Sequence, residues 1–283
     1  MKQRIITALV LAPLAIAAIF FLPLQLFTLF SAALFLLAAK EWAGFVNKTP
    51  SNAILYIFGL ILGLTLIAMP VSDIWQNGAL NSSLSLALSS AGAWWCVALL
   101  LVLRYPTSAA LWSSNKLLKS IFGLLTLLPF FWSLIVLRSV DMSEHFYYGA
   151  QLVMYVFLLV WAADTGAYFV GKKFGKTKLA PNVSPGKTIE GFAGGVVSSL
   201  IVAFFAAQYF AISDDNLFAF FVISIITTLV SALGDLTESI FKREAGLKDS
   251  GKLLPGHGGI LDRIDSLTAA TPIFALFYIH WLM

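Results

Sequence analysis

Nine apolar stretches, each close to membrane-spanning length, recur along this chain and restrict the folds open to it. A helix needs about 20 mostly apolar residues to cross the hydrocarbon core of a bilayer, and unpaired backbone groups cannot be left in lipid. Charged residues make up only 11% of the sequence, whereas soluble domains carry about 25%. We therefore predict an all-α, polytopic integral membrane protein with about nine transmembrane helices, at residues 5–22, 24–39, 53–71, 84–103, 119–138, 150–171, 191–212, 217–241 and 266–283.

The first span follows a short basic segment, Met-Lys-Gln-Arg, and at first sight resembles a signal peptide. Its apolar run is long enough to cross a membrane, however, and no polar mature domain follows it. An uncleaved first helix is therefore expected.

The basic residues predict which way the loops face, because cytoplasmic loops carry an excess of Lys and Arg. With the N-terminus inside, 17 of the 18 basic residues fall in cytoplasmic loops, and Arg138 alone lies outside. The sequence thus predicts an N-in, C-out arrangement. The inside residues are Lys2, Arg4, Lys40, Lys48, Arg104, Lys116, Lys119, Lys172, Lys173, Lys176, Lys178, Lys187, Lys242, Arg243, Lys248, Lys252 and Arg263.

The polar chemistry is concentrated after residue 160. Residues 1–150 are predicted to form a scaffold or lipid-contact region of about five helices, because they consist of aliphatic spans joined by short turns. Residues 151–283 are predicted to form the catalytic transmembrane region, with cytoplasmic loops at 172–190 and 242–265.

A carboxylate near the cytoplasmic end of the sixth span, Asp164, lies in the run Trp161-Ala-Ala-Asp164-Thr-Gly-Ala-Tyr168. A charge at the centre of a bilayer costs roughly 2.5–3.5 kcal/mol on insertion scales. Such a residue is retained where it is paired or faces a polar cavity. We favour a role in a substrate cavity, and the alternative is a structural partner for a neighbouring lysine.

The loop that follows is rich in lysine, which by itself indicates only positive-inside topology. Gly186-Lys187-Thr188 resembles the end of a P-loop, but Pro181 stands where that motif needs glycine, and a membrane span follows; we reject that reading. What remains is a predicted turn, Ser184-Pro-Gly186, which presents Lys187 and Thr188 at a helix start. Such an N-terminus favours phosphate through its free N–H groups and its dipole.

Two acids on the eighth span, Asp235 and Glu238, are three residues apart and therefore share a helix face. Inside a membrane protein this pair is unfavourable unless a cation compensates it. The alternative is that both acids lie beyond the membrane edge and are solvated.

The segment from Ser239 to Asp265 packs five basic and four acidic residues between two apolar stretches. Asp249, Asp262 and Asp265 offer oxygen ligands, and Gly256, Gly258 and Gly259 let backbone N–H groups approach an anion. Oxygen ligands, together with a single cysteine in the whole chain, favour Mg²⁺ over zinc. Acids in a first helical turn also occur simply as dipole partners, and His257 is either a ligand, a proton donor, a phosphate contact or a turn residue. The segment predicts a metal-assisted phosphate site at a membrane surface.

At this point the residues resemble a known family. The pattern is similar to the signature of bacterial phosphatidate cytidylyltransferases (CDP-diacylglycerol synthases), and it covers about residues 160–270. Many members carry a second lysine where this chain has Gly186. The matching elements are Asp164-Thr-x-Ala167-Tyr168, Ser184-Pro-x-Lys187-Thr188-x-Glu190-Gly191 and Ser239-x-x-Lys242-Arg243-x4-Lys248-Asp249-x-Gly251-x3-Pro255-Gly256-His257-Gly258-Gly259-x2-Asp262-Arg263-x-Asp265.

The resemblance implies CTP and phosphatidate as substrates, with no nucleic-acid partner, and a homodimer in the bacterial inner membrane with its active site facing the cytoplasm. It implies Mg²⁺, with a second ion such as K⁺, on Asp235, Asp262 and Asp265. We predict catalytic roles for these three aspartates and for Lys248 and Asp249. The predicted substrate-binding residues are Asp164, Ser184, Lys187, Thr188, Glu190, Lys242, Arg243, Gly256, His257, Gly258, Gly259 and Arg263.

Two other functions stay open on the residues alone. A CTP-dependent kinase of a polyprenol-type lipid would transfer the γ-phosphoryl group to a hydroxyl and would need Asp249 or His257 as a base. A cation transporter would use Asp164, Asp235 and Glu238 as relays, but these acids lie beside glycine-rich loops and lysines at one face, not at the midplane in paired half-sites.

Overall fold

The protein is built almost entirely of helices in a computed structural model that describes residues 2–47, 52–142 and 144–283, without the side chains of residues 2–6 and 8. Lys48, which entered the orientation argument, lies outside the described residues, as do the side chains of Lys2 and Arg4. The predicted all-α class is confirmed. The helices are α1 (Lys2–Phe21), α2 (Leu24–Val46), α3 (Ala53–Ala68), α4 (Ser82–Leu103), α5 (Ala109–Trp112), α6 (Lys116–Ser139), α7 (Tyr148–Phe174), α8 (Ile189–Tyr209), α9 (Asp214–Ala245) and α10 (Leu261–Trp281).

Six of these helices, α2, α4, α6, α7, α8 and α9, are long and apolar enough to cross a membrane. The apolar part of α1 and the whole of α3 are shorter, and α10 has 21 residues. Each of the nine predicted spans overlaps one of these nine helices, and six of the nine are long and apolar enough to cross a membrane, so the prediction of a polytopic membrane protein is confirmed. The count of nine spans and the N-in, C-out orientation remain predictions.

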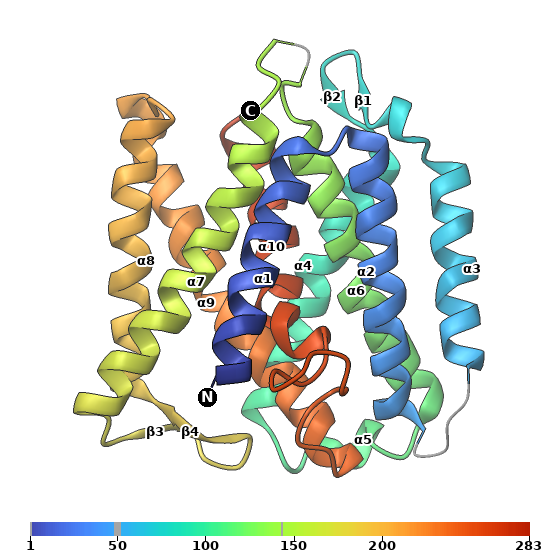
Figure 1. Ribbon diagram of the computed structural model, residues 1–283, viewed down its shortest axis with the longest axis vertical. Helices are drawn as coiled ribbons and strands as arrows, with labels where there is room; N and C mark the ends of the chain where they lie inside the picture. The colour runs from blue at the N-terminus through green and yellow to red at the C-terminus, as the bar shows by residue number, and fades with distance from the viewer. Residues whose placement is uncertain (1, 48–51, 143) are drawn as a thin grey trace.

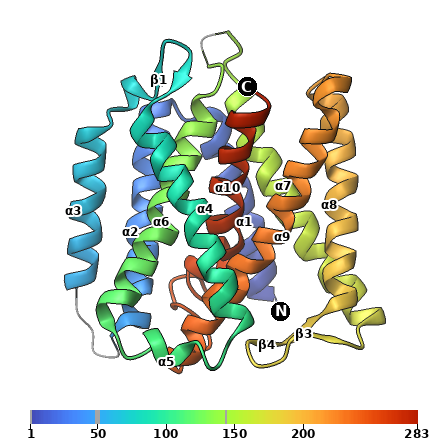
Figure 2. The ribbon, with the colours of Figure 1, turned by 180° about the vertical axis from the view of Figure 1, so that it is seen from behind.

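The helices stand side by side, with α10 near the centre and α3 and α8 at opposite edges (Figures 1 and 2). α10 contacts α4, α6, α7 and α9. The loop of residues 246–260, the hairpin of β3 (Lys178–Ala180) and β4 (Ser184–Thr188) and the start of α1 lie together at one end of the bundle (Figure 1). The opposite end carries a 3₁₀ turn (Val71–Asp73), a small hairpin of β1 (Trp75–Gln76) and β2 (Ala79–Leu80), and the C-terminus.

The second helix runs further than its apolar stretch predicts, to Val46 rather than to residue 39. Its last turns bury Trp42, whose ring centroid lies 4.8 Å from that of Phe241 on α9. The Trp42 indole also donates a hydrogen bond of 2.9 Å to the Lys119 carbonyl. Burial of these aromatic groups fixes the end of α2 against α9. It thereby places Glu41 at the end of the bundle that carries the polar loops.

The prediction of a turn at Ser184-Pro-Gly186 is wrong. Residues 184–188 form strand β4, which pairs antiparallel with β3 in the register Lys178↔Thr188 and Ala180↔Ser184. The chain reverses instead at residues 181–183, where Pro-Asn is itself a strong turn sequence. Lys187 therefore extends from a strand, and α8 begins two residues later.

Arg138 lies at the end of α6 away from these loops, and it is fully buried. Its Nε donates a hydrogen bond of 2.8 Å to the Ile19 carbonyl near the end of α1. A cation at the last carbonyls of a helix satisfies orphan acceptors and complements the helix dipole. Arg138 thus ties the end of the first helix to α6.

Candidate active site

Close contact between α9 and α10 creates the centre of the site. A Cβ added to Gly234 would lie 2.5 Å from the Asp265 carbonyl oxygen and 3.0 Å from the Ala269 Cβ. Only glycine permits this approach of the two backbones. The next residue, Asp235, is thereby held within electrostatic range of Asp265, as the spacing of the acids predicts.

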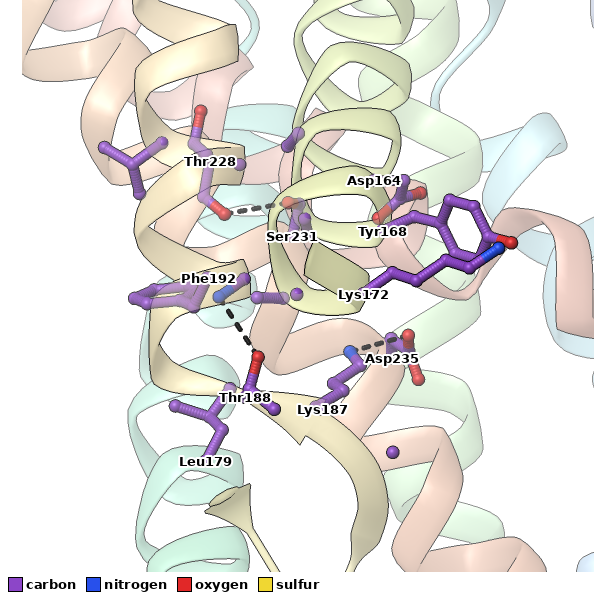
Figure 3. A pocket seen from close by; sticks show the side chains of 18 residues that line it. Asp164, Tyr168, Lys172, Leu179, Lys187, Thr188, Phe192, Thr228, Ser231 and Asp235 are labelled. Carbon is purple, nitrogen blue, oxygen red and sulfur yellow. Dashed lines mark hydrogen bonds and ion pairs between the residues drawn. The ribbon is translucent and has the colours of Figure 1, made fainter. Parts of the chain in front are cut away.

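A cavity of about 460 Å³ opens between α7, α8, α9 and strand β4 (Figure 3), and we call it the polar cavity because Asp164, Lys187 and Asp235 line it. Lys187 extends from β4 and its Nζ lies 2.6 Å from the Asp235 Oδ2. The exposed Asp164 side chain lines the same cavity and lies within electrostatic range of Lys187 and Arg263. The structure therefore brings together the predicted residues Asp164, Lys187 and Asp235.

The start of α8 is ordered by two of the predicted substrate-binding residues. Thr188 caps the helix, since its Oγ1 accepts a hydrogen bond of 3.1 Å from the Gly191 N–H. The Glu190 carboxylate accepts bonds of 3.1 Å from the N–H groups of Lys176 and Thr177. These contacts hold the loop that carries Lys187, while Ser184 lies partly buried at the start of β4.

Lys242 links two buried acids at the end of α9. Its Nζ forms a short ion pair with the Glu238 Oε2 and lies 2.8 Å from the Asp262 Oδ1. The side chains of Glu238 and Asp262 are only 3% and 5% exposed. Buried charges require such partners, because an unpaired charge inside a protein is strongly unfavourable.

The other oxygen of Asp262 organises the loop. Asp262 Oδ2 accepts hydrogen bonds from Ser250 N (2.8 Å), Ser250 Oγ (2.9 Å) and Gly259 N (2.8 Å). Burial alone would raise the pKa of the Asp262 carboxyl, but the bonds from Lys242, Gly259 and Ser250 hold it below its ordinary value. Both oxygens of this carboxylate are thus committed to partners within the protein.

Glu41 of α2 completes the loop's attachment from the first half of the chain. Its carboxylate accepts bonds from Ile260 N (3.0 Å) and Leu261 N (2.8 Å). The Ser250 Oγ lies 3.0 Å from the same carboxylate and donates its single hydrogen either to Glu41 or to Asp262. Leu261 is the first residue of α10, so Glu41 satisfies orphan N–H groups at this helix start. We call Glu41, Lys242, Ser250, Gly259 and Asp262 the loop clamp.

The glycine-rich turn before α10 adopts the backbone that its glycines predict. Gly256 and Gly258 have φ values of 74° and 82°, in the region that side chains disfavour. The Gly259 N–H, however, is already bonded to Asp262. His257 is partly buried, and its carbonyl accepts a 3.1 Å bond from Arg263 Nε.

Three predicted residues lie at the margin of this arrangement. Lys248 and Asp249 are exposed on the loop. Arg243 is exposed as well, and its Nε donates a bond of 3.2 Å to the Val183 carbonyl. Arg243 therefore connects α9 to the β3–β4 hairpin. In the part of the chain that the structure describes, none of the three forms a hydrogen bond or ion pair with the buried carboxylates of Glu238 and Asp262.

A group that we call the acidic trio, Asp235, Glu238 and Asp265, is the part of the site least satisfied by protein partners. Asp265 lies within electrostatic range of the other two acids. Its Oδ1 accepts a bond from the neighbouring Ser266 N–H, and the Glu238 Oε1 is buried with no hydrogen-bond partner among the described residues. The two oxygens of Asp235 have partners, since Oδ2 pairs with Lys187 and Oδ1 accepts a bond of 3.4 Å from Ser239 Oγ. The Glu238 Oε1 is therefore the oxygen of the trio that best fits a hard cation. The Asp262 Oδ1 accepts from Lys242 alone among the described residues, so it keeps a lone pair with which it could join the trio.

The predicted metal set is less tightly gathered than another acidic group. In the described part of the chain, the ligand atoms of Asp141, Glu144 and His145 lie within 4.8 Å of one another. That group lies at the opposite end of the bundle and is largely exposed. The aspartates at 235, 262 and 265 are not gathered to that distance, and Lys187 and Lys242 pair with two of their oxygens.

Sequence reasoning missed two residues of the loop clamp. Glu41 hydrogen-bonds to residues up to 220 positions away, and no local spacing indicates that contact. The available signal was a carboxylate at the end of an apolar span, where an unpaired acid is unfavourable. Ser250 gave no signal of its own. Glu238, identified with Asp235 as a costly pair, lies in the centre of the site.

Comparisons with known proteins cover the whole chain. A model of the cytidylyltransferase family matches residues 2–281. The phosphatidate cytidylyltransferase of Haemophilus influenzae is 44% identical over 285 residues, covering 98% of this chain and 98% of that protein. The protein of the same name from Pseudomonas aeruginosa is 42% identical over 276 residues, covering 97% and 96%. That from Staphylococcus haemolyticus is 36% identical over 236 residues, covering 77% and 90%.

Proposed function

The chain belongs to the cytidylyltransferase family, and we propose that it catalyses the reaction of CTP with phosphatidate to give CDP-diacylglycerol and pyrophosphate. The observation that carries this proposal is the identity to named phosphatidate cytidylyltransferases over nearly the full length of both chains. The lysines and carboxylates at the polar end of the bundle supply the chemistry that such a reaction needs.

The lipid phosphate can act as a nucleophile without a general base. A phosphate monoester has a second pKa of about 6 when it behaves like a phosphorylated side chain, so phosphatidate is largely dianionic at neutral pH. One of its oxygens forms a bond to the α-phosphorus of CTP, and the bond from that phosphorus to the pyrophosphate oxygen breaks. The protein must therefore position two anions that repel each other and stabilise the charge of the leaving group.

The cations of the site are placed for this task. Lys187 lies in the polar cavity, where it now pairs with Asp235, and it would turn to the phosphates of CTP. Arg263 lies in electrostatic range of Asp164 at the margin of that cavity and would neutralise the lipid phosphate. Lys242 stays with Glu238 and Asp262 and holds those carboxylates in place.

We further propose that Mg²⁺ is held by Asp235, Asp262 and Asp265, with a second ion such as K⁺ nearby. The unpartnered Glu238 Oε1 supports a cation at this position. When bound, such an ion polarises phosphate oxygens and supports the pyrophosphate leaving group. Lys187 would be released from Asp235, while the Asp262 Oδ1, whose partner among the described residues is Lys242, keeps a second lone pair for the ion.

We place the enzyme in the bacterial inner membrane, with its polar end facing the cytoplasm, and we expect a homodimer. The cytoplasmic orientation is supported by the lysines on the loop and hairpin at that end of the bundle. CTP is a cytoplasmic nucleotide carrying several negative charges, so it would reach the cavity from this side.

The test uses the purified protein in detergent with phosphatidate, Mg²⁺ and CTP labelled with ³²P at either the α or the γ position. The α label is expected in the lipid fraction and the γ label in pyrophosphate. Label from γ-labelled CTP in a lipid alcohol, with release of CDP, would instead identify a lipid kinase. If an intact preparation transfers neither label to lipid, the cytidylyltransferase proposal is wrong.

A further inference from the structure

A second cavity, which shares no lining residue with the polar cavity, lies between α1, α2, α6, α7 and α10. It measures about 490 Å³, and apolar side chains from α1, α2, α6, α7 and α10 form most of its lining. Trp161 lines this apolar groove, whereas Asp164, three residues further along α7, lines the polar cavity. Residues at this spacing share a helix face. The two cavities therefore follow one another along the same face of α7.

The end of the groove nearest the polar cavity carries a cation. Arg263 and His257 both line it, and the Arg263 Nε donates to the His257 carbonyl at 3.1 Å. The terminal nitrogens of Arg263 have no hydrogen bond or ion pair with any residue that the structure describes, and the guanidinium lies in electrostatic range of Asp164. A phosphate group bound to Arg263 would thus lie beside the cavity proposed for CTP.

Two buried polar atoms in the groove lack protein partners. Ser31 is 3% exposed, and its Oγ has no hydrogen-bond partner among the described residues. The His257 Nδ1 is likewise buried and without a partner. Ser31 and His257 both line the groove. Because buried polar atoms are nearly always hydrogen-bonded, Ser31 and His257 are polar groups of the groove that the described part of the protein leaves unsatisfied.

The groove reaches the surface beside α1. This helix lies in front of α10 in Figure 1, with α7 and α2 on either side. Leu14, one of its lining residues, is 53% exposed. The α1 side chains that line the groove run from Leu11 to Ile19, which is about 12 Å of helix. The groove is therefore accessible from the side of a membrane-spanning bundle.

From these features we infer that the groove binds phosphatidate, with an acyl chain along α1, α2 and α6 and the phosphate at Arg263. The inference rests on the proposed function and assigns the lipid substrate its own subsite. A third cavity of about 400 Å³, lined by Tyr155, Ala206 and other residues of α7 and α8, is also mostly apolar. Among the described residues, no Lys or Arg lines that cavity, so it lacks a cation to pair with a phosphate, and it provides a control.

The kinetic test compares dihexanoyl with dioleoyl phosphatidate in Ala15→Trp, which fills the groove, and in Ala206→Trp, which fills the control cavity. Ala15 and Ala206 are both partly buried. In Ala15→Trp, kcat/KM for the long-chain lipid should fall at least about tenfold more than kcat/KM for the short-chain lipid. Ala206→Trp should keep the wild-type ratio. Equal losses for both lipids in Ala15→Trp, or an equal change of the ratio in Ala206→Trp, would overturn the assignment.

Arg263→Gln tests the phosphate end. The KM for phosphatidate of either chain length should rise at least about tenfold, with the KM for CTP changed less than threefold, and Arg263→Lys should restore part of the loss. A rise confined to the KM for CTP would assign Arg263 to the nucleotide and contradict the proposal. If wild-type protein converts neither lipid, the proposed function fails, and the groove is then judged by binding alone.

A binding test needs no turnover and no variant. Wild-type protein is irradiated with phosphatidate that carries a diazirine in its acyl chain, and the labelled peptides are identified. Label should fall on residues 11–34 and 130–134, and excess dioleoyl phosphatidate should compete it away. Label on residues 202–210 instead, or equal labelling by the corresponding phosphatidylcholine, would show a general lipid contact and overturn the substrate assignment.

Discussion

The loop clamp and the acidic trio adjoin each other, yet their carboxylates differ in how fully the protein satisfies them. In the clamp, Glu41 and Asp262 each accept several hydrogen bonds, and Lys242 pairs with Asp262. In the trio, Asp265 lies in range of Asp235 and Glu238, and one oxygen of Glu238 has no partner among the described residues. Asp262 and Asp265 are one helical turn apart on α10. Equal spacing in a motif therefore does not imply equal bonding: the acids of the clamp hold the loop, whereas the Glu238 Oε1 of the trio has no protein partner among the described residues.

Of the substitutions compared here, Asp265→Asn, which changes the acidic trio, should have the largest effect on activity. Loss of one strong electrostatic contact in an active site typically lowers turnover by about 100- to 1000-fold. The melting temperature should stay the same or rise, because the change removes one of several neighbouring negative charges. Transfer of the α label to lipid measures activity, and Asp215→Asn, an exposed acid at the other end of α9, is the control. Full activity of Asp265→Asn would show that the Asp265 carboxylate is not required for the reaction.

Lys242→Gln should break the link between the two regions and act mainly on stability. It leaves the buried carboxylates of Glu238 and Asp262 without their cation, and loss of one partner of a buried pair costs about 3–5 kcal/mol. The melting temperature in detergent should fall strongly, whereas Lys252→Gln, an exposed loop lysine, should leave it unchanged. Equal stability of the two variants would mean that the ion pairs do not hold the loop.

Glu41→Gln should loosen the clamp alone. The amide cannot accept hydrogen bonds at its nitrogen, so one or two of the bonds from Ser250, Ile260 and Leu261 are lost, at a cost of about 1–3 kcal/mol of folding stability. The expected result is a lower melting temperature and faster proteolysis within residues 246–260. Glu144→Gln, an exposed acid at the opposite end, should behave like the wild type. Unchanged proteolysis in Glu41→Gln would contradict the clamp.

Of these substitutions, Ser250→Ala should have the smallest effect on folding stability. It removes the hydroxyl that donates to Glu41 or Asp262 but keeps the backbone N–H on Asp262. Loss of one such hydrogen bond costs about 1 kcal/mol of folding stability. A small decrease in melting temperature is expected relative to Ser114→Ala, an exposed serine. A loss as large as that of Lys242→Gln would give the hydroxyl a role that these contacts do not explain.

Much of the fold follows from the sequence because lipid imposes a simple rule on apolar stretches. Each predicted span lies on a helix, and the pairs Asp235–Glu238 and Asp262–Asp265 fall on helix faces as their spacing requires. The β3–β4 hairpin was not predicted, because a short strand in a polar loop has no apolar pattern. Glu41 could not be assigned either, since its partners depend on how Trp42 seats α2 against α9.

Whether the oxygens of a given carboxylate already have hydrogen-bond or ion-pair partners depends on the tertiary structure alone. Asp262 and Asp265 look alike in sequence, and only the positions of Lys242, Ser250 and Gly259 distinguish them. The roles of Lys248 and Asp249 and the three-aspartate metal set remain predictions for the same reason. A one-dimensional pattern shows which side chains are present, but not which of their atoms are already bonded.

The most direct test of this division measures α-label transfer per folded molecule in Asp265→Asn and Glu41→Gln side by side, with the melting temperature of each. We expect Asp265→Asn to keep its stability and to lose about 100- to 1000-fold in turnover. We expect Glu41→Gln to lose stability but to retain turnover within about tenfold once the folded fraction is counted. The reverse pattern, a stable but inactive Glu41→Gln beside an unstable but active Asp265→Asn, would contradict this division of the acids into a clamp and a reactive group.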